Sequence, residues 1–65
     1  MDNEAMDAIA GAIVTIHTAW SSLRGIATRL GDDAKCVGLV AVEGDDDAIQ
    51  YIIPATSIQY IETEN

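Results

Sequence analysis

The stretch from Glu4 to Leu30, EAMDAIAGAIVTIHTAWSSLRGIATRL, decides how this chain is expected to fold. Its large apolar residues recur at alternating steps of three and four, the heptad spacing of a helical packing seam. The seam contains Met6, Ile9, Ile13, Ile16, Trp20, Leu23, Ala27 and Leu30. Asp2 or Asn3 can cap the start of such a helix, and Gly31 supplies the left-handed residue that is common just past a helix end. The pattern predicts one helix over about 4–30, a rod roughly 40 Å long.

The side of this helix opposite the seam is also poor in charge. No charged residue lies between Asp7 and Arg24, and small residues such as Gly11, Ser22 and Gly25 recur there. Outward faces of ordinary surface helices carry charges. We therefore expect the helix to be covered on two sides.

After Gly31 the periodicity changes to two, which is typical of strands. Strands are predicted at about 36–43, 48–53 and 57–62, followed by a tail at 63–65. Pro54 ends the second strand because proline cannot donate to a sheet ladder. The expected fold is α+β, a single domain over 1–65 with one long N-terminal helix and a three-stranded antiparallel meander.

Self-association is expected to supply stability that one copy lacks. A chain of 65 residues buries only roughly 60% of the surface that its unfolded form exposes. One cysteine, Cys36, and one histidine, His17, cannot form an internal disulfide or a closed zinc site. Both faces of the predicted sheet look apolar, and one helix can cover only one of them. We therefore predict a homo-oligomer, formed through the helix seam, through sheet stacking or through the free edge of the third strand.

The net charge of -8 excludes several classes of partner. Such a charge repels phosphate backbones and anionic lipid surfaces, so it disfavours direct nucleic-acid binding and membrane-surface binding. The longest uncharged run, at 8–23, is too short and too polar to span a bilayer. The start Met1-Asp2-Asn3-Glu4 does not resemble a secretory signal, so we expect a cytoplasmic protein in which Cys36 is reduced.

The few basic residues lie close together in the sequence and suggest one possible ligand site. Repeated around an oligomer axis, Arg24, Arg29 and Lys35 could gather into an anion pocket, with Trp20 as a stacking platform and His17 as a further contact. The competing interpretation is that the bases complement the helix dipole and form salt bridges, and that His17 is a hydrogen-bonded packing residue.

No arrangement in the sequence indicates catalysis. Cys36 begins a strand at the far end of the predicted helix from His17, so the two cannot form a dyad within one chain. Neither Ser21 nor Ser22 has the context of a nucleophile elbow. We expect no catalytic residue, no metal and no cofactor, and a protein that is not an enzyme.

The acidic residues of the predicted loops could contact a basic protein partner. They are Asp32, Asp33, Glu43, Asp45, Asp46 and Asp47. The cluster at 43–47 is too short for a calcium loop of about 12 residues. The simpler interpretation is that these residues form solvated turns.

The segment from Tyr51 to Ile61, YIIPATSIQYI, resembles the strand, tight turn and strand that end Sm-like barrels, which also begin with a helix. The resemblance covers 11 of 65 residues and is generic to two strands joined by a short turn. Three predicted strands fall short of the five that such a barrel needs, and the charge is wrong for RNA. The family is therefore not assigned from the sequence.

Two functions are compatible with this sequence. The first is an inhibitor or adaptor, of the kind encoded by phages or mobile elements, that docks on a basic protein surface. The second is an oligomeric sequestering protein that binds a small anionic ligand, such as a signalling nucleotide, between subunits. Replacing the acidic residues would impair the first, and replacing Arg24 and Arg29 would impair the second.

Overall fold

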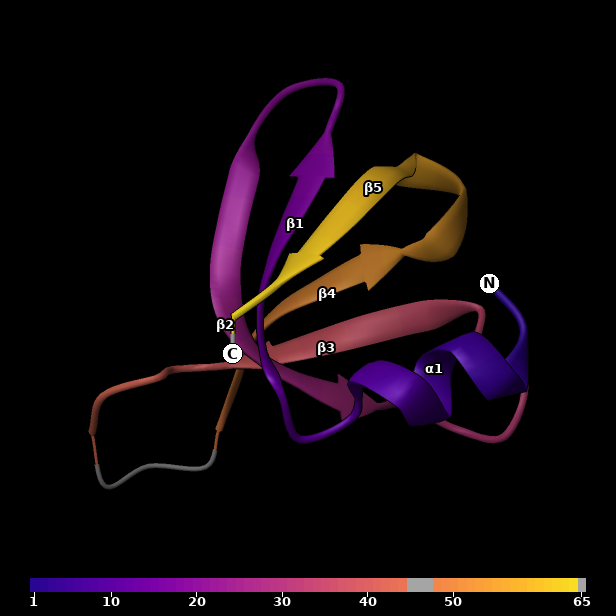
Figure 1. Cartoon of the computed structure of the whole chain (residues 1–65), viewed down its shortest axis with the longest axis horizontal. Coiled ribbons are helices and arrows are strands. Elements are labelled where there is room, and N and C mark those ends of the chain that lie inside the picture. Colours follow the sequence, from indigo (N-terminus) through magenta and orange to yellow (C-terminus); the bar gives the residue numbers. More distant parts are fainter. Residues whose placement is uncertain (45–47, 65) are drawn as a thin grey trace.

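The computed structural model describes residues 1–44 and 48–64, and they form one short helix and a five-stranded antiparallel sheet (Figure 1). The elements in chain order are α1 (Asn3–Ile9), β1 (Ile13–Thr18), β2 (Ser22–Arg29), β3 (Cys36–Val40), β4 (Ile49–Pro54), a 3-10 turn η1 (Ala55–Ser57) and β5 (Ile58–Thr63).

The predicted long helix is wrong, because the helix ends at Ile9 and the rest of the stretch forms the β1–β2 hairpin. Gly11 follows the helix with a φ of 84°, a conformation that favours glycine, and turns the chain into β1. The run from Ile13 to Thr18 is rich in β-branched residues, which favour strands. Its alternation of buried Val14 and Ile16 with less buried neighbours has a period of two, and this period prevails over the heptad spacing.

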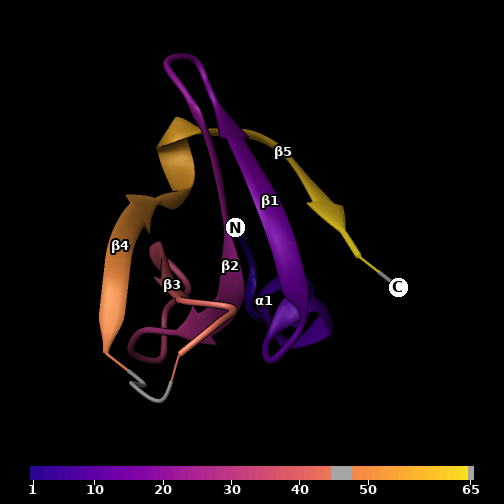
Figure 2. The same ribbon diagram turned by 90° about the vertical axis from the view of Figure 1, so that its left-hand side faces the viewer.

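The predicted three-stranded meander is also wrong, although strands do lie near the three expected places. The sheet order is β4-β3-β2-β1-β5, so β5 pairs with β1 and not with β4 (Figure 2). The hairpin formed from the supposed helix supplies the missing partner. The sheet therefore has five strands, whereas only three were predicted. The small number of predicted strands was one reason not to assign the Sm-like family.

The core lies between α1 and the inner face of the sheet. Its buried residues are Met6, Val14, Ile16, Ala27, Ala34, Val37, Leu39 and Ile53. Three residues assigned to the oligomer seam, Met6, Ile16 and Ala27, are therefore buried within this chain. Ile9 and Leu23 pack against the same core, whereas Trp20 is 83% exposed at the hairpin turn. The seam expected along a helix does not exist as a continuous stripe.

Side-chain hydrogen bonds fix α1 at its start and against β2. The Asp2 carboxylate accepts the Ala5 N–H at 2.7 Å, which confirms the predicted capping of the helix start. Arg29, at the end of β2, donates to Asn3 Oδ1 at 2.6 Å and forms an ion pair with Asp7. Within residues 1–44 and 48–64, no helix is long and apolar enough to cross a membrane.

Candidate functional site

A cluster of polar side chains lies on the outer face of the sheet, where β1 runs between β2 and β5. His17 of β1 is directly opposite Ser22 on one side and Tyr60 on the other. Its Nδ1 is 2.8 Å from Ser22 Oγ, and its Nε2 is 2.6 Å from Glu62 Oε1. Tyr60 stacks on the imidazole with the ring centroids 4.1 Å apart and the planes at 13°. We call His17, Ser22, Tyr60 and Glu62 the His17 cluster.

The strand register explains why the His17 cluster forms. Side chains alternate between the two faces of a strand, and Val14 and Ile16 point into the core, so His17 points outward. Directly opposite partners share a face, which brings Ser22 and Tyr60 to the same side. Glu62 is two residues beyond Tyr60 on β5 and therefore shares that face. The cluster links three strands near the turn of the β1–β2 hairpin.

The partners of His17 determine which nitrogen of the neutral ring carries the proton. An ionised carboxylate can only accept a hydrogen bond, so Nε2–H must donate to Glu62. The other nitrogen, Nδ1, then has a free lone pair and accepts the Ser22 hydroxyl proton. Hydrogen bonds thus connect a carboxylate to an imidazole and the imidazole to a hydroxyl.

A second polar link joins Arg24 of β2 to Glu64, the residue after β5. Arg24 donates through Nε and Nη2 to the two carboxylate oxygens of Glu64, at 2.7 and 2.8 Å. This bidentate bond lowers the pKa of Glu64 below its usual value and raises the pKa of Arg24. Both groups are at the surface, where water screens their attraction.

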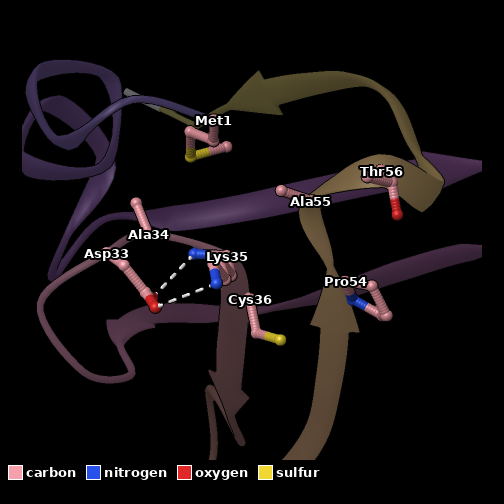
Figure 3. A pocket seen from close by; sticks show the side chains of 8 residues that line it. All are labelled: Met1, Asp33, Ala34, Lys35, Cys36, Pro54, Ala55 and Thr56. Atoms are coloured by element: carbon pink, nitrogen blue, oxygen red, sulfur yellow. Dashed lines mark hydrogen bonds and ion pairs between the residues drawn. The ribbon is translucent and has the colours of Figure 1, made fainter.

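An open hollow of about 470 Å³ lies where the β2–β3 loop meets the end of β4 (Figure 3). Its lining residues are Met1, Asp33, Ala34, Lys35, Cys36, Pro54, Ala55 and Thr56. The Lys35 carbonyl accepts the Ala55 N–H at 2.8 Å, which joins the loop to the turn after β4. Ala34 adopts a φ of 53° with its side chain buried. Lys35 Nζ, the cation in the lining, is 3.8 Å from Asp33 Oδ2.

The two terminal strands of the sheet carry apolar side chains that the chain does not cover. Ile49, Tyr51 and Ile52 of β4 are between 42% and 64% exposed. Tyr51 is opposite the fully buried Leu39, so it faces the core side of the sheet and is still 45% exposed. Within the described residues, neither β4 nor β5 has a second strand beside it. Figure 2 shows these two strands at opposite sides of the molecule.

The five residues predicted to bind an anion are not gathered in one chain. Arg24 and Arg29 project from opposite faces of β2 and are paired with Glu64 and Asp7. Lys35 lines the hollow, which includes none of the other four. Trp20 lies at the turn of the hairpin, and His17 belongs to the cluster on the outer face. Any site that used all five would need more than one subunit.

The acidic residues predicted to contact a partner lie in two places. Asp32 and Asp33 precede β3 and Glu43 follows it, so they are at opposite ends of that strand. The remaining members of the set, Asp45, Asp46 and Asp47, lie outside the described residues. The described members of the set, Asp32, Asp33 and Glu43, thus do not form one patch. Over residues 1–44 and 48–64, no three His, Cys, Asp or Glu side chains lie together as a metal site.

Sequence analysis missed the His17 cluster because its members are far apart in the chain. Glu62 and His17 are 45 positions apart, and only the pairing of β1 with β5 joins them. The alternation of apolar Val14 and Ile16 with polar Thr15 and His17 was the available signal for an exposed strand face. When these residues were interpreted as part of a helix, Thr15 and His17 did not indicate an exposed strand face.

Comparison with known proteins identifies no relative, since no protein-family model, curated protein or solved structure matches this chain.

Proposed function

We propose that this chain is a small acidic binding protein that assembles into a homo-oligomer and docks on a basic protein surface as an inhibitor or adaptor. It acts by binding, without catalytic turnover. We place this function in the cytoplasm, where the free and half-buried Cys36 remains reduced.

The observation that carries the proposal is the open sheet, whose edge strand β4 carries exposed apolar side chains. An edge strand presents unpaired backbone N–H and C=O groups that another strand can satisfy. Here β4 and β5 end the sheet on its two sides, and the exposed Tyr51 and Ile52 lie on β4. Head-to-tail pairing of β4 with β5 of a second copy would satisfy both edges. It would also cover Tyr51 on the core side.

The charge supports a basic partner. The three basic residues, Arg24, Arg29 and Lys35, are each paired with a carboxylate of the same chain. Little positive charge is left to oppose the eleven acidic residues. A strongly negative surface attracts basic proteins and accelerates their association.

Assembly through the sheet edge is tested by replacing Ile52 with lysine. A lysine on an edge strand disfavours edge-to-edge pairing, so Ile52→Lys should reduce the wild-type oligomer to a monomer of 6.9 kDa in analytical ultracentrifugation. Trp20→Lys is the matched control, because it exchanges another exposed apolar residue, one even more exposed than Ile52, for the same charge outside β4 and β5. A monomeric wild type, or equal assembly of both variants, would refute the edge model.

Docking on a basic surface is tested with an immobilised peptide rich in lysine and arginine. Asp32→Asn/Asp33→Asn should weaken binding about tenfold more than Asp2→Asn/Glu4→Gln, although both pairs remove the same charge. The control pair keeps the helix cap because asparagine also caps helices. Equal losses would show that only net charge matters, which would overturn the role assigned to the β2–β3 loop.

A further inference from the structure

The His17 cluster has the hydrogen bonds that activate a serine hydroxyl. An effective nucleophile needs a base within hydrogen-bond reach and a third group that orients the base. Ser22 Oγ is 2.8 Å from His17 Nδ1, and His17 Nε2 is 2.6 Å from Glu62 Oε1. We propose that Ser22 is a nucleophilic serine that accepts an acyl group from an activated aryl ester, with His17 as its base and Glu62 as the residue that positions His17.

The arrangement differs from a serine protease in the order of the ring nitrogens. There the serine faces Nε2 and the acid faces Nδ1. Here Glu62 accepts the hydrogen bond from Nε2–H, which leaves the lone pair of Nδ1 directed at the Ser22 hydroxyl. Either nitrogen of imidazole can accept a proton, so the exchanged order keeps the chemistry of a general base.

The surroundings of His17 hold the ring in place and leave Ser22 accessible. Tyr60 stacks on the imidazole, and only 19% of the His17 side chain is exposed. Ser22 itself is exposed at the start of β2. An immobilised base beside an accessible hydroxyl is the arrangement that a reaction with an external ester requires.

Trp20 indicates which class of ester would react best. It lies two residues before Ser22, in a turn fixed by Thr18, whose Oγ1 accepts the Trp20 and Ser21 N–H groups at 3.3 and 3.1 Å. The Trp20 side chain is 83% exposed, so it offers uncovered aromatic surface two residues before the nucleophile in the chain. Aromatic rings stack favourably on such a surface, which favours an aryl ester.

The reaction is a single acyl transfer. Ser22 Oγ forms a bond to the carbonyl carbon while its proton passes to His17 Nδ1. The bond from that carbon to the aryl oxygen breaks, and the aryloxide leaves with the electron pair. His17 then releases its proton to solvent. No electron is gained or lost by either partner, and the product is one acyl-serine per chain.

The experiment treats the intact chain with p-nitrophenyl acetate and measures acetylation of each residue by peptide mapping. Ser22 should be acetylated about 100 times faster than Ser21, its exposed neighbour, because only Ser22 has a base. Ser22→Ala should abolish labelling at this position and leave labelling of Ser21 unchanged. Equal rates at Ser21 and Ser22 would overturn the proposal.

Variants of the two supporting residues separate activation from simple exposure. His17→Gln should reduce Ser22 labelling to the rate of Ser21, and Glu62→Gln should reduce it about tenfold. The rate of Ser22 relative to Ser21 within one molecule is the readout, because it cancels differences in reagent concentration; since unfolding would also bring this ratio to one, the variants are compared in the folded state. A ratio that is unchanged in either variant would refute the role assigned to that residue, and circular dichroism would verify that each variant is folded.

Discussion

At the scale of single residues, the Arg24–Glu64 pair makes folding stability depend on pH in a defined direction. The hydrogen bonds from Arg24 lower the pKa of Glu64 in the folded chain below the ordinary value of a glutamate, which it has in the unfolded chain. Folding thus favours the ionised carboxylate. The contribution of the Arg24–Glu64 pair to folding stability is fully present above the ordinary pKa of glutamate. It disappears as the pH falls through the lower, folded pKa, because the folded chain must then take up the proton.

The prediction is that Glu64→Gln lowers the Tm slightly at neutral pH and has no effect in strong acid. The effect is small because both side chains are at the surface. Thermal unfolding of the two proteins between neutral and acidic pH measures it. In the Arg24→Gln background the same change should have no effect at any pH, because the pair is already broken. A destabilisation that persisted in that background would assign the effect to Glu64 alone.

At the scale of elements, the helix start and the strands after residue 35 were more predictable than residues 10–30. Asp2 caps α1 because short polar side chains at that position satisfy free N–H groups, which is a local rule. The strand ended by Pro54 and the strand after η1 follow from similarly local signals. The hairpin β1–β2 could not be recognised locally, because Ile16 and Leu23 fit a heptad as well as they fit inward-facing strand positions.

Contacts between elements that are distant in the sequence favour the β1–β2 hairpin over a helix. A side chain at Gly25 would place its Cβ 2.8 Å from the Val40 carbonyl oxygen, so β2 can approach β3 this closely only with glycine there. In the helical interpretation, Gly25 was one of the small residues on the second side of the helix that was expected to be covered. The candidate site was unpredictable for the same reason, since His17 and Glu62 meet only after β5 pairs with β1.

At the scale of the whole molecule, two forces act in opposite directions on assembly. The exposed apolar side chains of β4 favour contact between copies, while each copy carries a net charge of -8 and repels the next. Dissolved salt screens the repulsion, and the Debye length falls from about 30 Å at 0.01 M to about 3 Å at 1 M. Apolar burial does not depend on this screening. The oligomer should therefore be favoured by salt.

The prediction is that raising the ionic strength from about 0.02 M to about 0.5 M lowers the dissociation constant of the oligomer at least tenfold. Sedimentation over a dilution series at each salt concentration measures this change. Ile52→Lys should stay monomeric at every salt concentration, because it lacks the apolar edge contact that forms once salt screens the repulsion between copies. If oppositely charged groups held the copies together, salt would dissociate them instead, since it weakens attraction between surface charges as it weakens repulsion. Dissociation at high salt would therefore show that ion pairs between copies, and not the apolar edge of β4, form the interface.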